Sequence, residues 1–164
     1  MGARIEVKNA REESGEPIAD LIVLPSKLSG GLLDGSIIPN IIDEIPILSI
    51  AAAFAEGETI IRDATELRVK ESDRLKAISD GLLKLGVSHI NFDDGIKING
   101  NPRLLDLPGP VQIDSYDDHR IAMSFLIAGL NCNQPITVFD SDNILTSFPA
   151  FIELTASLGY NLEK

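Results

Sequence analysis

The stretch Leu-Arg-Val-Lys-Glu-Ser-Asp-Arg-Leu, residues 67–75, places five charged side chains in seven consecutive positions. It lies between a short run typical of a strand, residues 59–62, and an amphipathic pattern typical of a helix, residues 74–85. We therefore expect a helix to begin within this stretch. Acceptors and negative charge are favoured there because the first helical N–H groups have no partner in the helix.

The same stretch places one acid beside two cations. Glu71, Ser72 and Asp73 can each act as a cap or first-turn residue, while Lys70 precedes them and Arg74 follows Glu71 by three positions, on the same helix face. A carboxylate next to cations at a helix N-terminus is a way to build an anion-binding site with a proton-transfer group. The alternative is a solvated, salt-bridged helix start, which is a common use of such residues.

The composition of the 164 residues, 44% hydrophobic and 24% charged, is that of a soluble globular protein, and we expect one domain over 1–164. A net charge of −11 argues against a nucleic-acid partner. The single cysteine, Cys132, allows neither an internal disulfide nor a cysteine metal site. The most apolar helical run, residues 121–130, is too short to span a bilayer, and residues 1–4 begin no signal-peptide core. We expect a cytoplasmic protein with no membrane partner.

Hydrophobic periodicity, glycine and proline predict alternating strands and helices. The expected strands are residues 4–8, 19–24, 59–62, 88–92, 96–98, 111–113 and 136–139. The expected helices are residues 43–56, which Asp43 opens and Gly57 ends, 74–85, 121–130, and a last helix that Ser147 caps and Gly159 ends. Residues 9–17 are expected to form a loop, and Asp93-Asp94-Gly95 predicts a hairpin turn.

The order of these segments repeats at an offset of about 75 residues. Helices opened by Asp43 and Asp118 are each followed by a strand, and Asp63 and Asp140 each come directly after that strand. The pattern predicts an α/β fold (α+β in some schemes) made of strand-helix-strand-helix-hairpin units, with internal repeats 4–86 and 87–164.

A second charged group, Asp117-Asp118-His119-Arg120, precedes the apolar helix. We expect Asp118 to be the N-cap. An arginine in the first turn opposes the helix dipole at a cost of roughly a few tenths of a kcal/mol, and an anionic ligand would relieve that cost. We do not expect a metal site, because adjacent residues rarely share one ion.

Residues 67–75 and Asp118-His119-Arg120-Ile121-Ala122-Met123 resemble the two C-terminal signatures of the 5-enolpyruvylshikimate-3-phosphate (EPSP) synthase family. Ile42-Asp43-Glu44, residues 51–57 and Ser147-Phe148-Pro149 agree at the expected places, and residues 11–17 are similar to the branch noted for glyphosate tolerance. The resemblance implies an inside-out α/β domain, of which this chain holds about two of three repeats. It also implies that an N-terminal portion is missing.

The resemblance implies a step of aromatic amino acid biosynthesis, the shikimate pathway. The enolpyruvyl group of phosphoenolpyruvate is transferred to the 5-hydroxyl of shikimate 3-phosphate, and phosphate is released. By motif position, Glu71 is expected to move protons at the phosphoenolpyruvate methylene, and Asp43 to act as the base at the 5-hydroxyl. Lys70 is expected to contact that hydroxyl and the phosphate, and to serve as an acid. Arg74 and Arg120 are expected to bind the carboxylate and phosphate of phosphoenolpyruvate.

Three further residues have a secondary role, a structural role or none. His119 is expected to bind substrate in a secondary role, or else to orient its loop, and Asp73 to pair or cap. Many relatives carry a basic residue shortly before Ser-Phe-Pro, where this chain has Asp142, so Asp142 receives no role. No cofactor and no metal are implied.

The expected partners are the two small anionic substrates and the missing N-terminal portion, without which we expect the chain to be inactive. One alternative is a non-catalytic anion-binding module, which would gain nothing from carboxylates that face its ligand. Another is a purely structural domain. The positive charges of Lys70, Arg74 and Arg120 argue against it, because we expect no acidic partners that compensate them.

Overall fold

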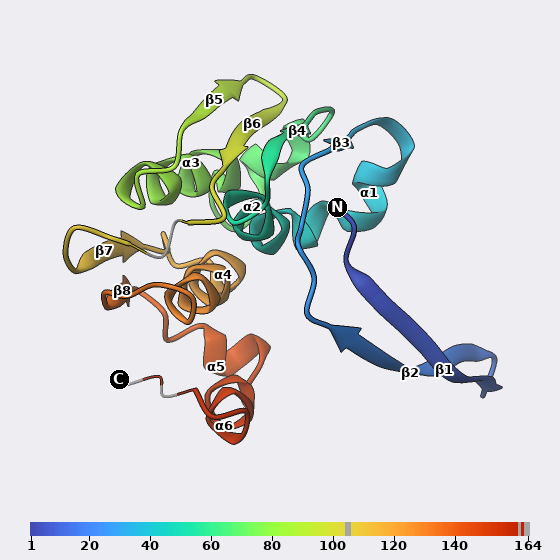
Figure 1. Cartoon of the computed structure of the whole chain (residues 1–164). Helices are drawn as coiled ribbons and strands as arrows, with labels where there is room; N and C mark the ends of the chain where they lie inside the picture. Colours follow the sequence, from blue (N-terminus) through green and yellow to red (C-terminus); the bar gives the residue numbers. More distant parts are fainter. Residues whose placement is uncertain (104–105, 161, 163–164) are drawn as a thin grey trace.

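Three small sheets and the helices that pack on two of them make up the fold, in a computed structural model that describes residues 1–103, 106–160 and 162 (Figure 1). The strands are β1 (Arg4–Glu13), β2 (Glu16–Leu24), β3 (Leu32–Leu33), β4 (Gly57–Ile61), β5 (His89–Phe92), β6 (Gly95–Gly100), β7 (Val111–Asp114) and β8 (Ile136–Phe139). The helices are α1 (Ile38–Ile41), α2 (Ile45–Ala53), α3 (Arg74–Lys84), α4 (His119–Gly129), α5 (Ile144–Ser147) and α6 (Phe151–Ser157). Short 3-10 helices cover Gly35–Ile37, Ile42–Glu44 and Thr65–Val69.

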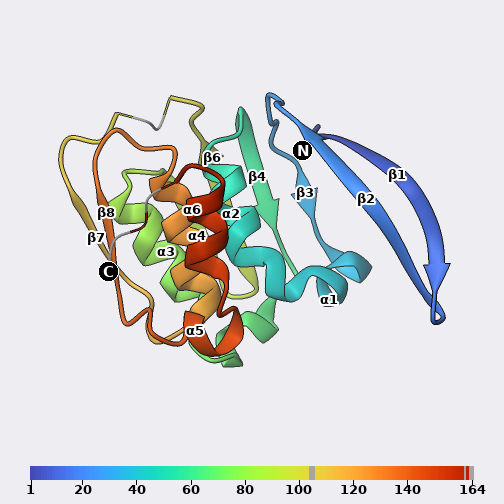
Figure 2. The same cartoon turned by 90° about the horizontal axis from the view of Figure 1, so that it is seen from below.

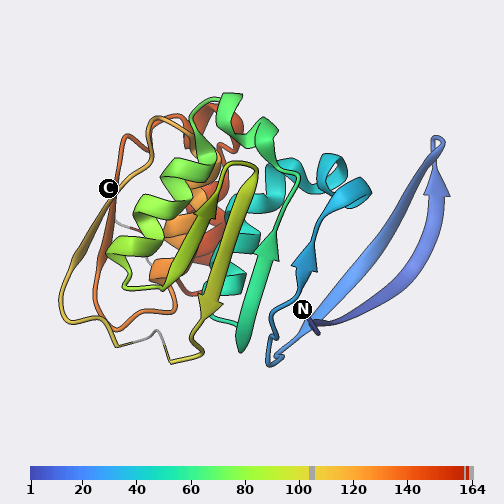
Figure 3. The same ribbon diagram turned by 90° about the horizontal axis from the view of Figure 1, so that it is seen from above.

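The central sheet has the strand order β3-β4-β6-β5 (Figure 3). β3 runs parallel to β4, while the hairpin β5–β6 adds antiparallel through β6. A second, two-stranded sheet pairs β7 with β8 in parallel. Each parallel pair is joined by a connection that contains a helix, as parallel strands require.

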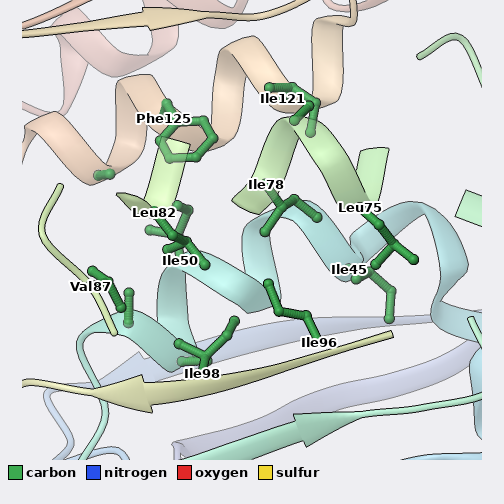
Figure 4. Close-up of a cluster of buried hydrophobic side chains, with 14 of the residues drawn as sticks. Ile45, Ile50, Leu75, Ile78, Leu82, Val87, Ile96, Ile98, Ile121 and Phe125 are labelled. Atoms are coloured by element: carbon green, nitrogen blue, oxygen red, sulfur yellow. The ribbon is translucent and has the colours of Figure 1, made fainter. Parts of the chain in front are cut away.

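The core lies between the central sheet and helices α2, α3 and α4 (Figure 4). Ile96 and Ile98 of β6 point into it, and α3 contributes Leu75, Ile78 and Leu82 at helical spacing. α3 packs closely on α4 at Gly81, which leaves room for the ring of Phe125; a Cβ at position 81 would lie 2.0 Å from the Phe125 Cζ atom. The N-termini of these two helices carry the charged motifs.

The N-terminal hairpin corrects one prediction. Residues 9–17, expected to form a loop, belong mostly to β1 and β2, which pair along most of their length and turn at Ser14 and Gly15, both with positive φ. A bulge follows Lys8, and Asn9 adopts φ 52°. The hairpin extends away from the helices, and nearly all of its residues are exposed (Figure 2). Charged residues are compatible with strands here because neither face is buried.

Two helix starts differ from the predictions. Asp43 does not open a long helix: it lies in the 3-10 turn Ile42–Glu44, and α2 begins at Ile45 and ends at Ala53. Gly57 is therefore the first residue of β4 rather than a helix cap. Ser147 is the last residue of α5 and caps nothing, because the proline after Phe148 separates α5 from α6. Gly159 does follow the C-cap of α6, with φ 88°.

The stretch Gly35–Ala53 is, by length and composition alone, apolar enough to cross a membrane, with a mean hydropathy of 1.4. The buried core helices of soluble proteins can be equally long and apolar. Here Ile45, Ile50, Ala52 and Ala53 are buried in the main core, which accounts for the hydropathy of the stretch.

We predict that Gly81→Ala destabilises the chain by about 1–3 kcal/mol, the usual cost of overpacking a filled core. Helix propensity alone would favour alanine by about 1 kcal/mol, so packing decides the sign. Urea unfolding followed by circular dichroism measures the change. Gly31→Ala is the control, because a Cβ there meets no atom within 4 Å. A Gly81→Ala variant as stable as the parent would contradict the close packing of α3 on α4.

Candidate functional site

The site is organised around the guanidinium of Arg74, whose side chain is 0% exposed at the start of α3. Its Nε donates to Asp118 Oδ2 at 2.8 Å, its Nη1 to Asp43 Oδ1 at 2.8 Å and its Nη2 to Glu71 Oε2 at 2.6 Å. A buried charge is tolerated only when it is paired and hydrogen-bonded, and three carboxylates meet that need here.

Asp118 is the most enclosed of the three acids. As N-cap of α4, it accepts hydrogen bonds from the backbone N–H groups of Arg120 and Ile121, and it also accepts the hydroxyl hydrogen of Ser72 at 3.0 Å. Burial alone would raise the pKa of Asp118, but the hydrogen bonds and charge of Arg74, with Ser72 and the helix N–H, hold that pKa below its ordinary value. One carboxylate thus joins the start of α3 to the start of α4.

Asp43 links these helices to the turn before α2. Its Oδ1 accepts from Arg74 and lies 3.8 Å from the Lys70 Nζ atom, and its Oδ2 lies 3.6 Å from Arg120 Nη2. Partial burial would raise the pKa of Asp43, but Arg74, Arg120 and Lys70 together leave it lowered. Asp43 is therefore ionised at neutral pH and faces three cations.

The remaining two cations each have a second acidic partner. Lys70 pairs with Glu66 at 2.6 Å, and this hydrogen bond raises the pKa of Lys70. Arg120 Nη1 donates to the backbone carbonyl of Asp43 at 3.0 Å and lies 3.4 Å from Glu44 Oε1. Both cations remain partly exposed, at the rim of the cluster around Arg74.

The structure therefore brings together the predicted residues Asp43, Lys70, Glu71, Arg74 and Arg120, from segments far apart in the sequence. His119 is the first residue of α4 and is half-buried; among the described residues its ring makes no hydrogen bond. Asp73 is the N-cap of α3, accepting from the Lys76 N–H, and also pairs with Arg68, as predicted.

Asp142 lies elsewhere. It lines a cavity of about 650 Å³ between α4, β8, α5 and α6, whose other lining residues are mostly apolar.

One expectation is wrong: the cations are not uncompensated. Lys70, Arg74 and Arg120 are paired with five carboxylates, including Glu44 and Glu66, which had no predicted role. Asp118 was predicted as a cap, but sequence reasoning missed that it also holds Arg74. The available signal was an N-cap aspartate, Asp118, in the same charged motif as Arg120. Its partner lies 44 positions earlier, and spacing alone does not reveal that contact.

The donor set does not resemble a metal site. Among the described residues, no group of three His, Cys, Asp or Glu side chains has an arrangement that would hold a metal ion. The carboxylates converge on a guanidinium instead. The chemistry available is the binding of anions by lysine and arginine, and proton transfer by the more exposed carboxylates.

We predict that Asp118→Asn lowers the free energy of unfolding at pH 7 by about 3 kcal/mol, since it removes one charge of a buried pair while asparagine still caps the helix. Because the folded-state pKa of Asp118 lies below the unfolded value, its stabilisation is present above pH 3.8 and is lost as the pH falls further. Urea titrations from pH 7 to pH 3 should show the difference between parent and variant shrinking at the acidic end. Glu6→Gln, on the exposed hairpin, serves as the control; a difference that does not vary with pH would contradict the assignment.

The comparisons with known proteins point to one family. The model of the family described as EPSP synthase (3-phosphoshikimate 1-carboxyvinyltransferase) matches residues 1–154. The 3-phosphoshikimate 1-carboxyvinyltransferase of Magnetococcus marinus is 49% identical over 163 residues, which are 99% of this chain and 36% of that protein. The protein of the same name from Coxiella burnetii RSA 493 is 46% identical over the same shares.

Solved structures agree with the sequence comparisons. EPSP synthase from Acinetobacter baumannii matches with a TM-score of 0.92 at 43% identity, over 98% of this chain and 37% of that one. The enolpyruvyl transferase NikO from Streptomyces tendae has a TM-score of 0.63 at 21% identity, over 94% and 32% of the two chains, a likeness in fold alone. These matches confirm the predicted α/β fold. The chain spans about 36% of the length of the curated relatives it matches, and it belongs to the EPSP synthase family.

Proposed function

We propose that this chain supplies part of the active site of a 3-phosphoshikimate 1-carboxyvinyltransferase, which transfers the enolpyruvyl group of phosphoenolpyruvate to the 5-hydroxyl of shikimate 3-phosphate and releases phosphate. Family membership supports the reaction class. The observation that carries the proposal is that Asp43 and Glu71 lie on the same guanidinium, at 2.8 and 2.6 Å. Two carboxylates fixed side by side among cations are suited to moving protons on an anionic substrate.

Two proton transfers are needed at the phosphoenolpyruvate methylene. A proton is first added to C3, so that the 5-hydroxyl oxygen can bond to C2, and a proton is later removed from C3 as phosphate leaves. We assign both transfers to Glu71, whose side chain is 50% exposed. Glu71 takes up a proton from solvent, gives it to C3, and as a carboxylate takes a proton back from C3 when phosphate leaves. The base that removes the 5-hydroxyl proton is Asp43. Its lowered pKa keeps it ionised, and its basicity increases once Arg120 and Lys70 turn from it to substrate oxygens.

The cations bind the two anionic substrates. Glu66 and Glu71 are 61% and 50% exposed, so either side chain has room to move away and leave its cation to a phosphate or carboxylate oxygen. The raised pKa of Lys70 keeps it protonated at neutral pH, as an acid or a phosphate ligand must be. Arg120, at the partly exposed rim, suits bidentate binding of a carboxylate or phosphate.

Arg74 has a different relation to substrate from that of Arg120. In this structure every nitrogen of its guanidinium already contacts a carboxylate, and the side chain is fully buried. Its first role is to orient Asp43 and Glu71, and it reaches phosphoenolpyruvate only when Glu71 leaves Nη2. His119, at the same helix end, is assigned a secondary substrate contact.

The proposed active site is incomplete within this chain. The five carboxylates around the three cations leave the cluster with excess negative charge, which does not by itself attract two anions. We propose that further cations come from the remaining polypeptide of a cytoplasmic enzyme, because the chain spans about 36% of its relatives. The isolated chain is then inactive, and residues 1–164 form one partial domain with repeats 4–86 and 87–164.

The deciding experiment measures phosphate release from phosphoenolpyruvate and shikimate 3-phosphate. The chain is assayed alone and then mixed with the N-terminal portion of a close relative, after their association has been shown by size-exclusion chromatography. We expect activity only in the mixture. Activity from the chain alone would overturn the claim that it is incomplete. No phosphate release from a mixture in which the two polypeptides associate would favour a module that binds anions without catalysing a reaction.

In the active mixture, we predict that Glu71→Gln lowers kcat at least about 100-fold, the lower end of the range for a lost general acid–base group. Binding of phosphoenolpyruvate, measured by calorimetry, should be unchanged or tighter, because a carboxylate that competes for Arg74 has been removed. The matched control is Glu13→Gln, an exposed acid paired with Arg11 on the hairpin. Full turnover by Glu71→Gln would exclude Glu71 as the proton-transfer group.

A further inference from the structure

A second group of polar side chains lies beside the site and has no part in the proposed chemistry. Lys76 and Asp80, one turn apart on α3, meet Tyr116 of the turn between β7 and α4. The Tyr116 hydroxyl donates to Asp80 Oδ2 at 2.6 Å, and Lys76 Nζ donates to the same oxygen at 2.6 Å and to Tyr116 Oη at 3.0 Å. The Lys76 ammonium also lies 4.6 Å from the centre of the Tyr116 ring.

The backbone that carries Tyr116 is strained. Tyr116 and Asp117 adopt φ values of 54° and 59°, in the left-handed region that side chains with a Cβ rarely occupy. Such residues persist only where the surrounding structure holds them in place. Two left-handed residues in succession turn the chain sharply, so that Asp118 enters the buried interior as the N-cap of α4.

Several contacts hold this turn from the side of the second sheet. The Tyr116 N–H donates to Asp114 Oδ1 at 2.7 Å, the Ser115 hydroxyl donates to the Asp140 carbonyl at 2.7 Å, and the Asn143 side chain donates to the Asp117 carbonyl. These contacts anchor the turn to β7 and to the segment after β8. They do not fix its distance from α3.

α3 packs on β7 and α4 through the core, and in the part of the chain that the structure describes two polar links join the turn itself to α3. The inner link is the buried contact of Asp118 with Arg74 and Ser72. The outer link is Tyr116 with Lys76 and Asp80. Between them lies a cavity of about 250 Å³ lined by Ser72, Asp73, Lys76 and Tyr116, so packing alone does not hold the two segments together there.

We propose that Tyr116, Lys76 and Asp80 form a clasp that positions Asp118, and through Asp118 the guanidinium of Arg74 and the start of α4. The proposal rests on the proposed function, since it concerns the residues that bind and protonate substrate. The clasp residues touch no reacting atom and are positioning residues.

A surface ion pair that serves stability alone is the simpler interpretation. Lys76 and Asp80 are 57% and 38% exposed, and pairs this exposed contribute little to stability. The tyrosine distinguishes the two interpretations. A helix pair at this spacing needs no third partner, whereas Tyr116 extends the pair across the gap to the strained turn. Its hydroxyl makes a charge-assisted hydrogen bond, which restricts geometry more than a solvated ion pair does.

The first test follows the Arg74 Nε–H group in the chain itself. This hydrogen is buried against Asp118, so its exchange with solvent, measured by side-chain nitrogen NMR, reports opening of the inner link. We predict that Tyr116→Phe, which keeps the ring and removes the hydroxyl, speeds this exchange about tenfold, as expected for the loss of one hydrogen bond to a charged group. Glu58→Gln, which breaks an exposed pair with Lys97 on the central sheet, should leave it unchanged.

Urea unfolding of the same variants separates local from global effects. The clasp is supported if the exchange accelerates while the equilibrium constant for global unfolding stays within twofold of that of the parent chain. Unchanged exchange, or an acceleration that matches the loss of global stability, would overturn it. Because this test involves no substrate, it decides the clasp even if the proposed function fails.

The second test is a double-mutant cycle in the completed enzyme. Tyr116→Phe should lower kcat/KM for phosphoenolpyruvate about tenfold, mainly through KM. In an Asp118→Asn background the same substitution should change kcat/KM less than about twofold, because its effect passes through Asp118. Equal losses in both backgrounds would show that Tyr116 acts by another route and would refute the proposal.

Discussion

The burial of one positive charge determines how this part of the chain is built. The Arg74 side chain has no exposed surface, and an ion in such a place must be surrounded by acceptors. The acceptors come from three separate segments: Asp43 before α2, Glu71 before α3, and Asp118 at the start of α4. A fold that satisfies Arg74 therefore necessarily brings these three helix starts together. The same convergence gathers the partly exposed Lys70 and Arg120 at one surface.

The local conformations around Arg74 follow from this requirement. A continuous helix through Asp43 would direct its carboxylate according to helix geometry, whereas the 3-10 turn at Ile42–Glu44 directs it to the guanidinium. On the other side, the left-handed pair Tyr116 and Asp117 turns the chain so that Asp118 both caps α4 and receives Arg74. Backbone strain and irregular helix starts thus occur where the carboxylates must point at Arg74. The helices behind the charge cluster remain regular and well packed.

This division explains what the sequence revealed. α3, the hairpin β5–β6 and β8 were predicted within a residue or two, because periodicity and turn residues report burial and local geometry. The motif residues around Arg74 were predicted as a group through the family resemblance and the first-turn charges. The local pairs Lys70–Glu66 and Arg74–Glu71 have helical spacing, but the helix start at Asp43, its contacts with Arg74 and Arg120, and the role of Asp118 at Arg74 depend on contacts between segments 31 to 77 positions apart. Neither propensity nor spacing carries that information. The predicted internal repeat stays a prediction.

The exposed N-terminal hairpin has a consequence for how the chain behaves in solution. Ile5 pairs with Val23 and Val7 with Leu21, so four apolar side chains, each more than half exposed, share one face of β1–β2. At neutral pH the net charge of −11 keeps copies of the chain apart. Near the isoelectric point of about 4.5 that repulsion disappears, while the apolar face and its free strand edges remain. The colloidal stability of this polypeptide therefore depends on its negative charge, and we expect its copies to aggregate at mildly acidic pH.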